Sequence, residues 1–154
     1  MKKLITAILA LAVCTVVAQD RLAGHELSVN GFRNPSIGLE YRIHHFSLHG
    51  GYYPTNFESG VTTSFVRTGI TYWFLPVGDR EQPSSFYSSL SYARGLDREY
   101  RDKNAVMAEV GFRWMAWKGL NVRLGVVTLK APGEDWKVNP TPGISYSFML
   151  KKKQ

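Results

Sequence analysis

The amino-acid sequence predicts an all-β protein, a closed eight-stranded antiparallel transmembrane β-barrel that follows an N-terminal signal peptide. Three observations support this prediction: an apolar leader, eight segments in which apolar and polar residues alternate, and arginines on the polar side of that alternation. Residues 106–114 show the pattern most clearly. Valine, alanine and aromatic side chains share one face, whereas Glu109 and Arg113 lie on the other, because successive side chains of a strand point to opposite faces.

The first 18 residues are typical of a signal peptide. Lys2 and Lys3 precede an apolar run at residues 4–17, and Ala18 ends a small-residue cleavage site before Gln19. The apolar run of about 14 residues is shorter than the ~20 that a membrane-spanning helix needs. We therefore expect two parts, a signal peptide at residues 1–18 and a single β-barrel domain at residues 19–154.

Cys14 leaves a second interpretation open, in which this residue is the lipid-modified cysteine of a lipoprotein. Val13 stands just before it, where a small residue is expected. If cleavage instead follows Ala18, the mature chain contains no cysteine, and a disulfide or thiolate metal site is excluded. We expect no cofactor and no metal.

The charge of the mature chain argues against a nucleic-acid partner. Without Lys2 and Lys3, the 19 Lys and Arg residues fall to 17, against 12 Asp and Glu. Three of the positive charges form the terminal run Lys151, Lys152 and Lys153, which resembles a solvated tail. No segment of ~18 consecutive apolar residues follows the leader, which excludes a helical membrane protein.

Eight segments rich in β-branched and aromatic residues are expected to be strands, separated by Gly, Pro, Asn and Asp. They cover residues 22–32, 37–43, 46–54, 61–74, 85–94, 105–117, 120–130 and 143–150. The connections at 43–46 and 117–120 are tight, whereas those at 55–60, 94–104 and 131–140 are longer and polar. Alternating tight turns and long loops are typical of outer-membrane barrels.

The arginines decide which face of the strands meets lipid. An arginine on the lipid face of a barrel costs ~2–4 kcal/mol near the midplane. Four of them would cost about as much as the ~5–15 kcal/mol by which a whole domain is stabilised. We therefore predict a network of inward-facing charges in the lumen, with three carboxylates to pair four guanidiniums. Its members are Glu26, Glu40, Arg42, Arg67, Glu109, Arg113 and Arg123. Because eight strands enclose only enough space for side chains, the lumen is expected to be plugged.

Aromatic residues concentrate near the ends of the predicted strands, as in the two interfacial girdles of membrane barrels. The girdle at the side of the tight turns is predicted to contain Trp73, Phe74, Trp114, Trp117, Tyr146 and Phe148. The girdle at the opposite side is predicted to contain Tyr52, Tyr53, Tyr92 and Tyr100.

With these features the chain resembles the small OmpA/OmpX-type outer-membrane barrels. The resemblance covers the mature chain and includes the aromatic last strand Gly-Ile-Ser-Tyr-Ser-Phe at residues 143–148, although Met149 to Gln154 follow where such barrels often end. It implies insertion by the outer-membrane assembly machinery but no single activity. We expect a monomer in the outer membrane of a Gram-negative bacterium, in contact with membrane lipid. We expect no enzymatic activity, but a structural role in envelope integrity or binding through the outer loops.

Three alternatives remain open: a narrow channel, a lipid A-modifying envelope enzyme, and a soluble periplasmic β-barrel binding protein. An enzyme would need a Ser and a His near the outer leaflet. The histidines are His25, His44, His45 and His49, and Ser47 shares a strand face with His49. The His44–His45 pair has no carboxylate or cysteine at ligand spacing, so we expect no metal there.

The densest cluster of charges lies at residues 94–103. Arg94, Arg98, Arg101 and Lys103 are candidates for contact with the phosphates of lipopolysaccharide, because guanidinium groups suit phosphate. The alternative is a solvated loop of mixed charge.

Overall fold

The computed structural model describes residues 19–22, 24–58 and 60–150. The predicted signal peptide and the terminal lysines lie outside the described residues. Within the described part the chain forms strands and two short 3-10 turns, with no α-helix, which confirms the all-β prediction. None of its helical turns has the length and apolarity needed to span a membrane.

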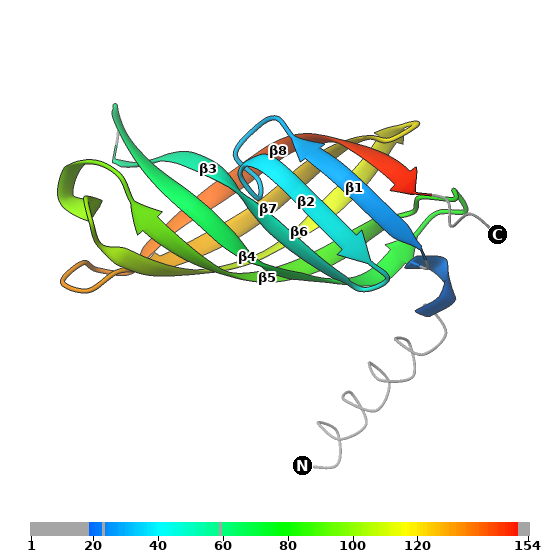
Figure 1. The fold of residues 1–154 in the computed structure, drawn as a ribbon, viewed down its shortest axis with the longest axis horizontal. Coiled ribbons are helices and arrows are strands. Elements are labelled where there is room, and N and C mark those ends of the chain that lie inside the picture. The colour runs from blue at the N-terminus through cyan, green and yellow to red at the C-terminus, as the bar shows by residue number, and fades with distance from the viewer. Residues whose placement is uncertain (1–18, 23, 59, 151–154) are drawn as a thin grey trace, which may run out of the picture.

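Eight antiparallel strands in the described part form one closed ring (Figure 1). Each strand pairs with the next in sequence, and β8 pairs back with β1. The strands are β1 (His25–Asn30), β2 (Ile37–Ile43), β3 (Phe46–Glu58), β4 (Val61–Val77), β5 (Ser84–Gly95), β6 (Asn104–Trp117), β7 (Leu120–Lys130) and β8 (Lys137–Leu150). The 3-10 turn η1 (Gln19–Leu22) precedes β1, and η2 (Arg98–Tyr100) lies between β5 and β6.

The strand boundaries agree with the sequence for β2 and β7 and differ most for β8. This strand begins at Lys137 rather than at residue 143. Pro140 and Pro142 indicate a loop, yet a proline can occupy a strand where its missing N–H would face away from the ladder. At the other end of the chain, Leu22 belongs to η1, so β1 begins only at His25.

The two ends of the ring differ. One end, called here the turn end, holds η1, the end of β8 and the connections β2–β3, β4–β5 and β6–β7 (Figure 1). The tight turns there need residues with positive φ, at His44 (52°) and Gly119 (93°). The opposite loop end holds the connections β3–β4, β5–β6 and β7–β8.

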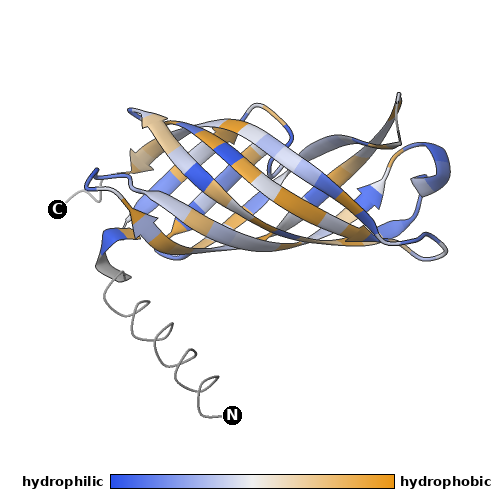
Figure 2. Ribbon diagram, turned by 180° about the vertical axis from the view of Figure 1, so that it is seen from behind, coloured by the Kyte–Doolittle hydropathy of each residue, from blue (hydrophilic) through white to orange (hydrophobic). Residues whose placement is uncertain are grey.

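Polarity is inverted relative to a water-soluble protein. Apolar and polar residues alternate along the strands (Figure 2), and the apolar ones face outward. Leu90 and Leu124, for example, are 62% and 64% exposed. Charged and hydroxyl side chains of the same strands are buried inside the ring.

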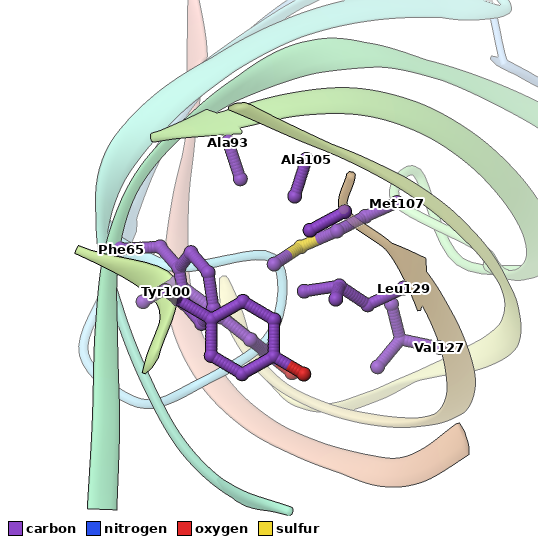
Figure 3. Close-up of a cluster of buried hydrophobic side chains, with 9 residues drawn as sticks. Phe65, Ala93, Tyr100, Ala105, Met107, Val127 and Leu129 are labelled. Carbon is purple, nitrogen blue, oxygen red and sulfur yellow. The ribbon is translucent and has the colours of Figure 1, made fainter. Parts of the chain in front are cut away.

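The interior has two zones. The part nearer the turn end contains the polar and charged residues together with a small cluster of Leu22, Trp73 and Tyr87, and a larger apolar cluster fills the loop end (Figure 3). The order of inward residues on β6 shows this arrangement, because Ala105 and Met107 precede Glu109 and Arg113 on the way to the β6–β7 turn. The apolar cluster consists of Tyr53, Phe65, Ala93, Tyr100, Ala105, Met107, Val127, Leu129 and Ala131.

Three of the predicted girdle aromatics are placed differently by the structure. Trp73 is fully buried inside the ring, and Tyr53 and Tyr100 are buried in the apolar cluster. For Trp73 the reason is alternation, because it shares the inward face of β4 with Arg67 and Thr71. The position of a residue along a strand indicates its height in the barrel, but its face depends on odd or even spacing.

Candidate functional site

The seven charged residues predicted for the lumen all lie inside the ring and are at most 2% exposed. Each of the three carboxylates is paired with at least one guanidinium. The residues come from β1, β2, β4, β6 and β7, so the ion pairs connect strands across the interior as well as strands that are neighbours.

Glu26 joins two arginines near the turn end. Its Oε2 lies 2.6 Å from Nη2 of Arg42, and its Oε1 lies 2.6 Å from Nη1 of Arg113. Arg42 also donates from Nη1 to the backbone carbonyls of Leu22 (3.0 Å) and His44 (2.7 Å). One guanidinium therefore binds η1, β1 and the β2–β3 turn together.

Glu40 and Arg123 form a second pair, with 2.7 Å between Oε2 and Nη1. The hydroxyl of Ser47 donates to Glu40 and accepts a hydrogen bond from Nε1 of Trp73 (2.8 Å). The indole ring lies 4.4 Å from the guanidinium of Arg113 and 5.0 Å from that of Arg123. Trp73 thus faces two cations, each of which is also paired with a carboxylate, a favourable contact in a site removed from water.

Glu109 has the most partners of the three carboxylates. Its Oε2 pairs with Nη2 of Arg67 at 2.8 Å, and its Oε1 accepts hydrogen bonds from the hydroxyls of Tyr87 (2.9 Å) and Thr141 (2.8 Å). The side-chain amide of Asn34 also donates to Oε1. Buried carboxylates need such partners, because an unpaired charge inside a protein is expensive.

The β1–β2 connection enters the lumen and is bound there by this pair. Asn34 is fully buried and donates to Glu109, to Tyr87 and to the carbonyl of Thr141, the last at 3.0 Å. Arg67 donates from Nη1 to the carbonyl of Pro35 at 2.6 Å. The connection therefore folds into the interior instead of extending outward as a loop.

Two glycines make room for Tyr87 beside Glu109. A Cβ added at Gly111 would lie 2.4 Å from the Tyr87 hydroxyl oxygen, and one at Gly125 would lie 2.5 Å from it. Gly111 and Gly125 are directly paired across β6 and β7. The hydrogen bond from Tyr87 to Glu109 thus depends on the absence of side chains at both positions.

The histidines are distributed over separate contacts. His49 is buried between the hydroxyls of Thr71 (3.2 Å) and Ser91 (3.1 Å), whereas Ser47 bonds Glu40 and Trp73. His25 bonds the hydroxyl of Tyr41 at 2.7 Å. His45 contacts the carbonyl of Trp73 at 2.8 Å. Ser47 and His49 share a face, as predicted from the sequence, but the two side chains serve different partners. Among the described residues, no group of three His, Cys, Asp or Glu residues could hold a metal ion.

The four candidate phosphate contacts lie around the β5–β6 connection at the loop end. Arg94 pairs with Asp102 at 2.9 Å, Arg98 donates from Nε to the carbonyl of Thr62 at 3.0 Å, and Lys103 pairs with Glu134. Arg101 is exposed. The structure therefore brings these side chains to one end of the barrel, with three of them already engaged by the chain itself.

The other five residues of the girdle predicted at the side of the tight turns lie toward the turn end, and Tyr52 and Tyr92 of the opposite predicted girdle are exposed as well. Trp114 and Trp117 are 58% and 68% exposed, Tyr146 and Phe148 are also exposed, and Phe74 is half-buried. Phe86 is exposed beside Phe74, and the two rings stack with centroids 6.1 Å apart.

Comparison of the chain with protein-family models, with curated proteins and with solved structures found no match. The resemblance to OmpA/OmpX-type barrels stays a prediction.

Replacing Glu109 by Ala should leave the Arg67 guanidinium buried without its carboxylate. We expect the free energy of unfolding of the refolded protein to fall by about 3–5 kcal/mol, the cost of breaking a buried ion pair. Urea titration in detergent micelles measures it. The double variant Glu109→Leu/Arg67→Met removes both charges and should recover most of the loss. Equal destabilisation of the single and double variants would show that the charge pairing is not what matters.

Proposed function

We propose that this protein is an outer-membrane β-barrel of a Gram-negative bacterium, exported by a signal peptide at residues 1–18. Its role is structural or interactive: it maintains the integrity of the envelope or binds at the loop end, and its lumen is plugged by Glu and Arg side chains. The observation that carries the proposal is the inverted polarity, with ion pairs inside the ring and an apolar outer surface.

The apolar outer surface supports a membrane location. Exposed large hydrophobic residues occur on all eight strands, including Val29, Leu39, Leu48, Ile70, Leu90, Val110, Leu124 and Ile144. A belt of this kind exceeds the apolar patches that soluble monomers expose, whereas lipid chains accommodate it. Strands β3 to β8 contain 11 to 17 residues, enough for the ~9–11 that a tilted strand needs to cross a bilayer.

The closed ring also suits the bilayer because it has no free edge at the height where all eight strands pair. Each backbone N–H and C=O inside hydrocarbon must find a partner in the protein, and a closed antiparallel ladder supplies it. We place the turn end in the periplasm and the loop end outside, as is usual for such barrels.

Membrane location is tested by alkaline carbonate extraction of cell envelopes together with a variant of the belt. The native protein should stay in the membrane fraction. Leu90→Arg places a cation in the belt and should lower the free energy of unfolding in vesicles by ~2–4 kcal/mol. Thr62→Arg, an exposed position at the loop end, is the matched control and should change it little. Extraction of the native protein into the soluble fraction would contradict the proposal.

The plugged lumen predicts that the refolded monomer does not form a wide pore. In planar bilayers we expect no stable conductance on the nanosiemens scale, because Glu109 binds both Arg67 and Asn34 in the interior. A large stable conductance would favour the alternative of a channel. Its appearance only after Asn34→Gly would show instead that the β1–β2 connection acts as the plug.

A lipopolysaccharide contact at the loop end is the proposed interaction of Arg94, Arg98, Arg101 and Lys103. Replacing all four by Gln should reduce the amount of lipopolysaccharide that co-purifies with the protein, because guanidinium and ammonium groups bind phosphate. The comparison variant replaces Arg21 and Arg80, two arginines at the turn end, by Gln. It removes two positive charges, half as many as the fourfold variant. Unchanged co-purification from the fourfold variant would remove this contact from the proposal.

A further inference from the structure

The barrel wall has eight strands at the turn end but only six at the loop end. β1 and β2 contain six and seven residues, and they pair with β8 and β3 only as far as Ser145 and Tyr52. Beyond these points, residues 53–58 of β3 and residues 137–144 of β8 lie beside each other without a strand between them. We call the junction of these two segments the seam.

Prolines occur on both edges of the seam. The carbonyl of Ile144 accepts a hydrogen bond from the N–H of Gly31 at 2.9 Å, so the backbone of Ile144 faces the β1 side of β8. Backbone groups at alternate positions of a strand point to the same edge, and those of Pro142 and Pro140 therefore face the seam. On β3, the carbonyl of Asn56 faces β8, and Pro54 shares its direction. Because proline has no N–H to donate, neither edge offers a continuous row of donors for a backbone ladder.

In the described part of the chain, the side chain of Asn139 joins the two edges. Asn139 of β8 donates from Nδ2 to the hydroxyl of Thr55 at 2.8 Å and to the carbonyl of Asn56 at 2.9 Å. Every other junction of the wall is a backbone ladder of paired strands. The seam is therefore the part of the wall that opens at the lowest cost.

Apolar side chains flank the seam on both sides, beside the polar Thr55, Asn56 and Asn139. Outside, Tyr52 and Val138 are exposed, and Val138 is 65% exposed. Inside lies the apolar cluster, which includes Tyr53 of the seam itself and three alanines (Figure 3). The ring of Tyr100 covers this cluster, and its centroid lies 5.3 Å from that of the Phe65 ring. Tyr100 belongs to η2, in the connection between β5 and β6, and not to a strand.

We infer that the seam is a lateral entrance through which one hydrocarbon chain of an outer-leaflet amphiphile passes into the apolar cluster. The chain takes the place of the Tyr100 ring against Phe65, Met107 and Leu129. The carbonyls of Pro140 and Pro142, which face the seam, accept hydrogen bonds from the head group. This inference rests on the proposed membrane location.

The test uses the mature barrel, residues 19–154, which contains no cysteine, in vesicles that contain a phospholipid with a photoactivatable group in one acyl chain. After illumination, mass spectrometry maps the labelled residues. We expect labels on Met107 and Leu129, which are fully buried, in addition to the belt residues Leu39 and Leu90. A parallel sample with a photoactivatable free fatty acid shows whether a chain without a phospholipid head enters as well or better.

Variants of the seam make the test specific. Asn139→Ala should increase labelling of Met107 and Leu129 roughly tenfold, the effect of losing two neutral hydrogen bonds. Asn104→Ala, at the loop end but outside the seam, should leave it unchanged. Cross-linking Thr55→Cys to Asn139→Cys with a short thiol reagent should abolish the internal labelling, whereas cross-linking Val110→Cys to Val126→Cys on the β6–β7 ladder should not.

Three results would overturn the inference. The first is labelled Leu39 and Leu90 with unlabelled Met107 and Leu129 in both the native protein and Asn139→Ala. The second is internal labelling that persists when the seam is cross-linked, which would indicate another route. The third is absence of labels on the belt as well, and in that case the membrane location itself fails. If the cysteine pair does not assemble, the comparison of Asn139→Ala with Asn104→Ala decides.

Discussion

The pairing of buried guanidinium and carboxylate groups determines which way β1, β2, β4, β6 and β7 face, and the register of strand pairing passes this orientation to β3, β5 and β8. Arg42, Arg67, Arg113 and Arg123 cannot meet lipid without a cost comparable to the stability of the domain. Placed inside, they need acceptors, and Glu26, Glu40 and Glu109 supply them at 2.6–2.8 Å. Once these seven side chains point inward, alternation along each strand sends leucine, valine and isoleucine outward.

The same ion pairs organise the parts of the chain that are not strands. Arg42 holds η1 and the β2–β3 turn through their carbonyls, and Arg67 with Glu109 holds the β1–β2 connection through Pro35 and Asn34. A short first hairpin follows from this arrangement, because its connection ends inside the barrel. The seam at the loop end and the buried β1–β2 connection inside the ring therefore have the same origin.

Several features could be predicted from the sequence because placing the arginines inward or outward differs by a large free energy. Alternation together with the cost of exposed arginine predicts the strands, their antiparallel order and the inward charges. The beginning of β8 could not be predicted, because Pro140 and Pro142 are acceptable in a strand only when its other edge is free. Whether this edge of β8 is free depends on the length of β1. Tertiary contacts of Leu22 and Asn34 determine that length.

Other residues of the site were missed for local reasons. Trp73 lies at the height of an interfacial girdle but on the inward face. The sequence shows this face only through the even spacing between Trp73 and Arg67 on the same strand. Tyr87 lies in a segment of serines whose alternation is weak, so its face was not evident. Asn34 sits in a connection, where no periodicity indicates that a side chain turns back toward Glu109.

The central claim, that lipid surrounds a ring whose charges are inside, is tested most directly by tryptophan fluorescence in vesicles of brominated phospholipid. The four tryptophans allow variants that each keep one, with Phe at the other positions. Bromine on the lipid chains should quench Trp114, which is exposed on the outer surface, and leave Trp73, which is buried beside Arg113 and Arg123, nearly unaffected. Equal quenching of both, or strong quenching of Trp73 alone, would contradict the account.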